Sequence, residues 1–240
     1  MISRFHFPGR LPGDGEVALP DDLAHHALRV LRLRDGAPMV LFDGEGGEVE
    51  ARLAVRGKAG FALLGERHAC DRESPVRVVL AQALAAGDKM DWVVQKAVEL
   101  GVAAIHPVQA ERSVLRLSGE RADKRRAHWQ QVAVSACEQS GRNRIPEVAS
   151  VRPLAQWLDA MRGQCAYVLA PGGGAGFPAR ERPEGAVHVL VGPEGGWTES
   201  ELAACDAAGL QRVTLGPRVL RTETAGLAAL AVLQAHWGDF

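Results

Sequence analysis

The sequence predicts an α/β fold with a mainly parallel sheet covered by helices on both faces, preceded by a small, mostly β module. From Val76 onward, short apolar runs alternate with helical stretches, a pattern typical of parallel strands joined by helical crossovers. Before that point, short alternating segments such as "APMVLFDG" and "EVEARLAV" are separated by glycine turns. Such segments favour short antiparallel strands.

The alternation predicts where the strands and helices of the larger part of the chain lie. Strands are expected at 76–84, 102–108, 166–171, 186–192 and 212–216, and helices near 88–100, 119–139, 154–161, 198–208 and 223–237. The segment "ACDRESPV" is interpreted as a polar linker. We therefore expect two domains, 1–70 and 76–240.

Bulk composition indicates a folded protein that stays out of the membrane. The chain is 47% hydrophobic and 24% charged, values typical of globular domains. No apolar run approaches the roughly 20 residues that span a bilayer, and the start lacks the apolar core of a secretion signal. A cytoplasmic location is therefore expected.

Neither a disulfide framework nor a metal site is expected. The four cysteines stand far apart with no CxxC pair, which favours reduced, buried thiols. His25 and His26 are adjacent, and adjacent side chains point apart on a helix or strand.

The formal net charge is −1, but the basic residues are clustered. "HHALRVLRLRDG" and "SGERADKRRAHW" each contain several arginines or lysines. Such runs are either solvated faces or nucleic-acid contacts, and the sequence alone leaves both interpretations open.

Two glycine-containing loops follow expected strands, at the sheet edge where ligands of parallel sheets gather. The first, "GPEGGWTESE", has the Thr198 and Glu201 spacing of a capping box. It lacks the lysine and the spacing of a phosphate-binding loop. Its glutamates, with Glu194 at the centre, argue for a neutral or cationic ligand.

The second loop, "LGPRVLRTETAG", precedes the last apolar helix, which Thr222 can cap. Capping leaves Arg218 and Arg221 unexplained, because cations at a helix N-terminus are mildly unfavourable. Upstream, "GDKMDWVVQKAVELGV" predicts an amphipathic helix that buries Trp92. The segment "ACEQSGRNRIP" crowds more polar groups at a helix end than a cap requires.

These stretches together resemble one family, the RsmE-type 16S ribosomal RNA uridine-N3 methyltransferases of the SPOUT class. The matching segments, in the family's order, are "HHALRVLRLRDG", "QKAVELGVAAIHPV", "ERSV", "EQSGR", "VGPEGGWTESE" and "LGPRVLRTETA". The resemblance implies a PUA-like β-barrel RNA-binding domain at 1–70 and a SPOUT methyltransferase domain at 76–240. It also implies a C-terminal trefoil knot, a homodimer, and S-adenosyl-L-methionine as cofactor.

The resemblance further implies which residues form the site. The cofactor-binding residues would be Leu190, Gly192, Glu194, Gly195, Leu215, Gly216, Val219, Leu220, Thr222, Thr224 and Ala225. Arg221 would steady negative charge on the base, and Glu223 would orient that arginine or accept the proton. The RNA-binding residues would be Arg10, Arg29, Arg32, Lys89, Lys96, Arg112 and Arg142.

The expected activity is cofactor-dependent methylation of N3 of a uridine in 16S rRNA, within the 30S subunit. Two alternatives stay open at this point. One is a SPOUT methyltransferase that acts on another RNA, and the other is a non-catalytic rRNA-binding assembly factor whose glycine loops are structural.

Overall fold

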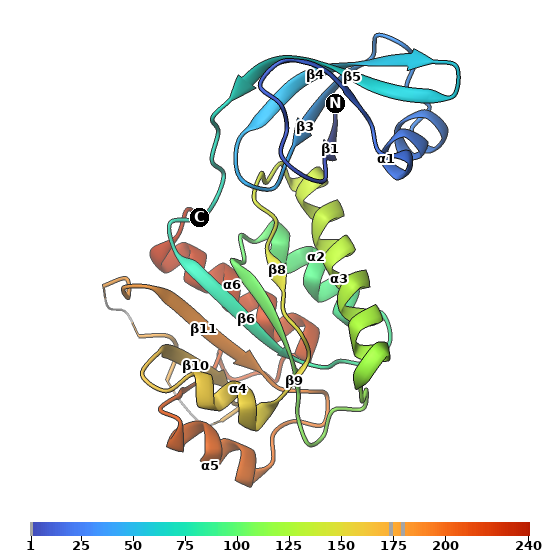
Figure 1. Cartoon of the computed structure of the whole chain (residues 1–240). Helices are drawn as coiled ribbons and strands as arrows, with labels where there is room; N and C mark the ends of the chain where they lie inside the picture. The colour runs from blue at the N-terminus through green and yellow to red at the C-terminus, as the bar shows by residue number, and fades with distance from the viewer. Residues whose placement is uncertain (1, 173–174, 179–180) are drawn as a thin grey trace. The chain divides into compact units, whose positions relative to one another are not determined.

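The computed structural model describes residues 2–172, 175–178 and 181–240, and the chain divides into two compact units (Figure 1). The N-terminal unit comprises the residues up to Glu73 together with Cys137–Ile145. The C-terminal unit comprises Ser74–Ala136 and Pro146–Phe240. Each unit has its own sheet, and the "EQSGRNR" segment clusters with the N-terminal one.

The N-terminal unit is built on one sheet in the strand order β1-β3-β4-β5-β2. Its strands are β1 (Ser3–His6), β2 (Gly15–Ala18), β3 (Pro38–Phe42), β4 (Glu48–Arg56) and β5 (Ala59–His68). Neighbouring strands of this sheet pair antiparallel, except β1 with β3, which pair parallel. Alternate residues such as Met39 and Leu41 face a core that also includes Leu53, so the expected β module is confirmed.

A short helical segment between β2 and β3 was missed by the sequence analysis. It consists of α1 (Asp21–His25) followed by one turn of π-helix, η1 (His26–Val30). The amide of Leu33 then bonds to the carbonyl of Ala27, and Arg32 between them has a left-handed φ of 54°. Glycine usually occupies such a position, because a Cβ there clashes with the backbone.

The C-terminal unit contains a sheet whose pairings are parallel, in the order β12-β10-β11-β6-β7-β8, with β9 also paired to β7. The strands are β6 (Arg77–Ala83), β7 (Ala104–Gln109), β8 (Glu147–Val148), β9 (Arg152–Pro153), β10 (Cys165–Leu169), β11 (Ala186–Val191) and β12 (Gln211–Val213). Because both faces are covered, β6 and β11 are almost continuously apolar and buried.

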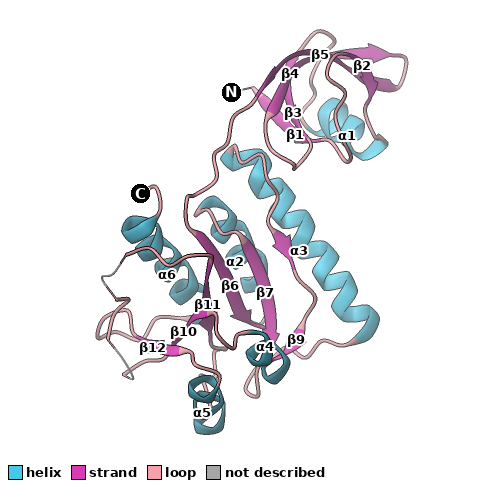
Figure 2. Cartoon of the chain, turned by 60° about the vertical axis from the view of Figure 1, so that its left-hand side comes forward, coloured by secondary structure: helices cyan, strands magenta, loops and turns pink. Residues whose placement is uncertain are grey.

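Helices cover both faces of this sheet, as the sequence predicted (Figure 2). They are α2 (Lys89–Glu99), α3 (Gly119–Ser140), α4 (Leu154–Ala160), α5 (Glu199–Ala207) and α6 (Thr222–Trp237). Helices α4 and α5 pack on the face that carries Ala81, Val168 and Leu190. Helix α6 packs on β6 and β11 from the other face, beside α2. Trp92, expected to be buried, is instead 46% exposed.

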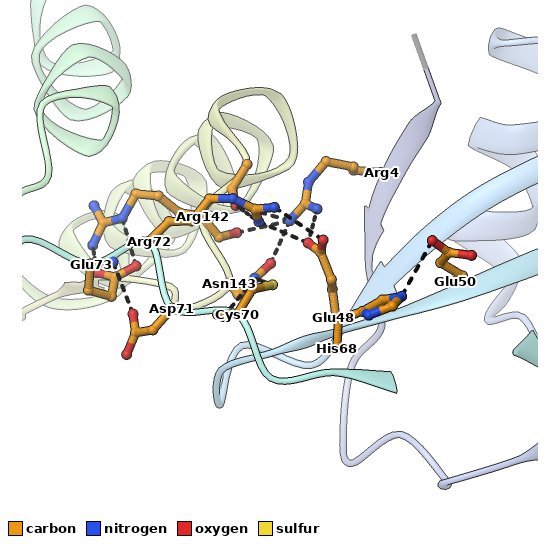
Figure 3. Close-up of polar contacts among 11 residues, drawn as sticks. Arg4, Glu48, Glu50, His68, Cys70, Asp71, Arg72, Glu73, Arg142 and Asn143 are labelled. Atoms are coloured by element: carbon orange, nitrogen blue, oxygen red, sulfur yellow. Dashed lines mark hydrogen bonds and ion pairs between the residues drawn. The ribbon is translucent and has the colours of Figure 1, made fainter. Parts of the chain in front are cut away.

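A polar network joins Cys137–Ile145 to the N-terminal sheet (Figure 3). Glu48 on β4 accepts hydrogen bonds from Arg4 and from Arg72, the latter at 3.0 and 3.2 Å. Arg4 also donates to the Asn143 side chain at 2.6 Å. The Arg72 hydrogen bond, opposed by desolvation and reinforced by Arg4, lowers the pKa of Glu48 to about 2.

We expect Glu48→Gln to destabilise the N-terminal unit by about 1–2 kcal/mol, because two arginines lose an ionised acceptor. Its folded-state pKa lies below the ordinary 4.5, so the stabilisation is present above that pH and is lost as the pH falls toward about 2. All five tryptophans lie outside this unit. Tryptophan fluorescence therefore does not report on the unfolding of this unit, and the measurement is hydrogen exchange of the β4 amides across this pH range.

Glu50→Gln is the matched control, because Glu50 lies on the same strand with a side chain 70% exposed. Equal protection of β4 in the two variants at neutral pH would contradict the role given to Glu48.

Candidate functional site

A cavity of the C-terminal unit lies at the carboxyl ends of β10, β11 and β12 and at the start of α6. Its volume is about 420 Å³, within the range of small-molecule sites. The lining residues are Lys89, Leu169, Ala170, Pro171, Val191, Gly192, Pro193, Glu194, Gly196, Trp197, Val213, Thr214, Leu215, Arg218, Val219, Leu220, Arg221, Thr222, Glu223 and Ala225. Each of the two loops singled out in the sequence therefore forms one wall of the cavity.

The structure brings most of the expected cofactor residues to this cavity. Those in its wall are Gly192, Glu194, Leu215, Val219, Leu220, Thr222 and Ala225. Leu190, Gly195, Gly216 and Thr224 lie outside the lining. Leu190 is fully buried and packs with Ala81 and Val168 in the core.

Thr222 does not cap α6, in contrast to the sequence-based expectation. The N-cap is Arg221, and Thr222 is the first helical residue. The Thr222 hydroxyl donates to the carbonyl of Gly192 at 2.5 Å and accepts from the side-chain amide of Gln82 at 2.8 Å. This buried hydroxyl therefore joins the ends of β6 and β11 to the start of α6.

The Thr198 capping box is confirmed. The Thr198 hydroxyl accepts from the Glu201 amide, and the Glu201 carboxylate accepts from the Thr198 amide. Glu201 also accepts from the backbone amide of Glu111, at 2.8 Å. The cap therefore fixes the end of the glycine turn to the segment after β7.

The glycine turn itself is shaped by a close neighbour. Gly196 has a φ of 68°, and a Cβ on Gly195 would lie 2.9 Å from the Cβ of Arg112. The Arg112 guanidinium donates to the carbonyls of Gly195 and Trp197, at 3.1 and 3.4 Å. Glycine at 195 therefore lets Arg112 pack against the turn.

Glu194 has a cationic partner, which revises the charge argument made from the sequence. Its carboxylate lies 3.0 Å from the Lys89 ammonium and accepts from the Ala86 amide at 3.1 Å. Desolvation raises the pKa of Glu194, but the Ala86 and Lys89 contacts outweigh it and hold the pKa below its ordinary value. The turn is therefore less negative than its sequence suggests.

The two expected catalytic residues both line the cavity. Arg221 is exposed at the N-cap of α6. Glu223, in the first turn of the helix, lies with its Oε2 atom 3.6 Å from the Lys89 ammonium. Among the residues that the structure describes, this buried oxygen has no hydrogen-bond partner.

Sequence reasoning missed the third wall of the cavity, formed by Leu169, Ala170 and Pro171 after β10. The Trp197 indole donates to the carbonyl of Leu169 at 3.0 Å and so connects this wall to the glycine turn. The signal was available, because the carboxyl-end rule applies to every strand of a parallel sheet. It was overlooked because "LAP" carries no polar side chain.

The residues expected to bind RNA differ in accessibility. Arg10, Arg29, Arg32 and Arg112 are exposed. Lys96 is ion-paired with Glu99 at 2.8 Å. Arg142, expected in the larger domain, clusters instead with the N-terminal unit, where its side chain is 6% exposed and pairs with Glu73. A buried, paired guanidinium is poorly placed to contact a phosphate.

The described residues contain neither a membrane-spanning helix nor a cluster of metal-binding side chains. No helix there is long and apolar enough to cross a bilayer. In the same ranges, no group of three or more histidine, cysteine or acidic side chains could hold a metal ion.

Comparison with known proteins agrees with this geometry. An RNA methyltransferase domain model matches residues 72–234, and an RNA methyltransferase PUA domain model matches residues 19–62. A ribosomal RNA small subunit methyltransferase E from Bacillus subtilis is 36% identical over 219 residues, which cover 87% of this chain and 86% of the relative.

Solved structures extend the similarity to the whole chain. A ribosomal RNA small subunit methyltransferase E from Neisseria gonorrhoeae, solved bound to S-adenosyl methionine, is 43% identical with a TM-score of 0.93 and full coverage of both chains. A Legionella pneumophila protein solved in complex with the cofactor SAM is 35% identical with a TM-score of 0.94, again over both whole chains. The chain therefore belongs to the ribosomal RNA small subunit methyltransferase E family.

Proposed function

We propose that this protein transfers the methyl group of S-adenosyl-L-methionine to N3 of a specific uridine in 16S rRNA. The observation that carries the proposal is the cavity closed by the glycine turn and the segment 215–225. The Neisseria gonorrhoeae relative, solved with S-adenosyl methionine, matches this chain from end to end.

The chemistry of the cavity fits this cofactor. Leu169, Val191 and Val213 supply apolar surface for an adenosine moiety. The lining also offers the Glu194 and Glu223 carboxylates and backbone groups, which can accept hydrogen bonds from the amino group of the cofactor. When bound, the cofactor would supply an electrophilic methyl group.

Methylation at N3 requires a free base and the loss of its imide proton. N3 takes part in Watson–Crick pairing, so the uridine must be unpaired or turned out of its stack. Glu223 accepts the N3 proton as the N–CH3 bond forms and the S–CH3 bond breaks, leaving a neutral thioether. Arg221 stabilises the negative charge that develops on O2 and O4.

RNA is proposed to contact exposed arginines of both units and the partly exposed Lys96. The proposed residues are Arg10, Arg29, Arg32, Lys96 and Arg112. Arg142 is left out because it is buried against Glu73. Lys89 is left out because Glu194 and Glu223 hold its ammonium. Residues 1–70 would form the PUA-like RNA-binding domain and residues 76–240 the methyltransferase domain.

The finer architecture is also part of the proposal. Helix α6 follows the edge strand β12 yet packs on β6 and β11, and this return supports a trefoil knot in the C-terminal chain. Exposed Trp92 and Val219 are apolar surface that a second copy would cover in a homodimer. The assembled 30S subunit in the cytoplasm is the proposed setting.

Arg221→Ala should reduce methylation about 10²–10³-fold, as for loss of one charge-stabilising donor, while calorimetry still detects cofactor binding. Arg162→Ala is the control, because Arg162 is an exposed arginine away from the cavity, 66% accessible. Full turnover in the Arg221 variant would remove this residue from the mechanism.

Arg32→Gly should leave stability within about 1 kcal/mol of the parent, since glycine relieves the left-handed backbone. RNA affinity should fall, and the slope of log affinity against log salt should drop by about 0.7–0.9, the value for one lost phosphate contact. Lys58→Ala removes an exposed cation outside the proposed surface. The same decrease of the salt-dependence slope in that control would show that the loss of net charge alone explains the effect.

The substrate is tested by mass spectrometry of 16S rRNA from a strain that lacks its own uridine-N3 enzyme, complemented with this chain. The expected result is restored N3-methyluridine at one position. A methyl group on another RNA would indicate a different methyltransferase, and binding without any methyl group would indicate an assembly factor.

A further inference from the structure

Lys89, the first residue of α2, lies at the cavity between two carboxylates. Its ammonium is 3.0 Å from Glu194 Oε1 and 3.6 Å from Glu223 Oε2. The three side chains are partly shielded, with 34%, 26% and 16% of their surfaces accessible. One cation therefore bridges acidic groups that stand 29 positions apart in the chain.

The position of Lys89 in its helix is unfavourable for a cation taken alone. The N-terminal end of a helix carries partial positive charge, which disfavours an ammonium in the first turn. The two carboxylates compensate for this, and the Glu194 contact raises the pKa of Lys89. The ammonium is therefore directed toward the cavity residues.

The contacts of Lys89 join three separate segments. Glu194 also accepts from the backbone amide of Ala86, just before α2. Glu223 belongs to the first turn of α6, and Glu194 to the glycine turn after β11. The loop before α2, the glycine turn and the start of α6 therefore meet at one ammonium.

One ammonium for two carboxylates leaves the cluster with an excess negative charge. Within the described ranges, the buried Oε2 of Glu223 has no hydrogen-bond donor, and a buried acceptor is costly to leave unsatisfied. Lys89 is near enough to orient this carboxylate, yet 3.6 Å is too long for a hydrogen bond. Lys89 is therefore the cation that holds this carboxylate by charge rather than by a hydrogen bond.

We propose that Lys89 is a positioning residue for methyl transfer, holding Glu194 and Glu223 so that the glycine turn and the proton-accepting carboxylate keep their places. The proposal rests on the methyltransferase function proposed above. It assigns Lys89 a role different from the RNA contact that the family resemblance implied.

The chain offers a matched comparison in Lys96. It lies on the same helix, is 35% accessible and forms an ion pair with Glu99 at 2.8 Å, but it does not line the cavity. If both lysines merely attract RNA, their alanine variants should behave alike. If Lys89 instead holds the two carboxylates in place, its alanine variant should change kcat, whereas the Lys96 variant should change only the KM for RNA.

The experiment compares Lys89→Ala, Lys89→Arg, Lys96→Ala and Glu194→Gln. For Lys89→Ala we expect kcat to fall about 10²-fold through misplacement of reacting groups, with the KM for RNA little changed. Lys89→Arg should restore much of the loss because the charge is kept. Lys96→Ala should raise the KM for RNA and preserve kcat.

The pH profile gives a second readout. The cavity that contains Glu223 is also lined by the charged residues Lys89, Glu194, Arg218 and Arg221. Each of these charges contributes to the electrostatic potential in the cavity. Against the effect of desolvation, Lys89 helps to hold the pKa of Glu194 below its ordinary value, so loss of the ammonium raises the pKa of Glu194. The acid limb of kcat should therefore move to higher pH in Lys89→Ala and stay in place in Lys96→Ala.

A third readout needs neither cofactor nor RNA. The Gly196 amide donates to the carbonyl of Pro193 at 2.9 Å, and its hydrogen exchange in the cofactor-free protein reports on the glycine turn. Exchange should accelerate in Lys89→Ala and Glu194→Gln but not in Lys96→Ala.

Unchanged exchange, or a Lys89→Ala variant that only raises the KM for RNA, would overturn the positioning role. Failure of the parent protein to bind S-adenosyl-L-methionine would instead reject the proposed function. The exchange result would then still decide whether Lys89 orders the turn.

Discussion

The cavity depends first on the hydroxyl of Thr222. This single buried group donates to the carbonyl of Gly192 and accepts from the side-chain amide of Gln82. It thereby connects the ends of two central parallel strands to the first turn of the last helix. Such buried polar groups are strongly destabilising when one partner is lost, so the contact fixes where α6 begins and therefore where Arg221 and Glu223 lie.

Around this centre, charged contacts fix the rim of the cavity. Arg112 packs against the glycine turn from one side, and Lys89 engages Glu194. The Thr198 capping box ends the same turn. A turn held by so many partners is already ordered before a ligand arrives, which limits the conformational entropy lost on binding.

The sequence predicted the alternation of strands and helices because buried parallel strands such as β6 and β11 are continuous apolar runs. It also located both loops of the site and the Thr198 cap. It failed where a side chain acts over a long sequence distance. Thr222 is of a residue type that often caps helices, but its hydroxyl forms a hydrogen bond with Gln82. Arg142 belongs to a basic segment, but it forms an ion pair with Glu73. Local propensity contains no information about such partners.

The central claim is that the Thr222 hydroxyl organises a cavity that binds S-adenosyl-L-methionine. Calorimetric titration of the cofactor into Thr222→Val tests it most directly, because valine keeps the shape of the side chain and removes only the hydroxyl. The expected result is a folded protein whose affinity is about tenfold lower or weaker still, equivalent to about 1.4 kcal/mol or more. Parent-like affinity in the folded variant would contradict the account.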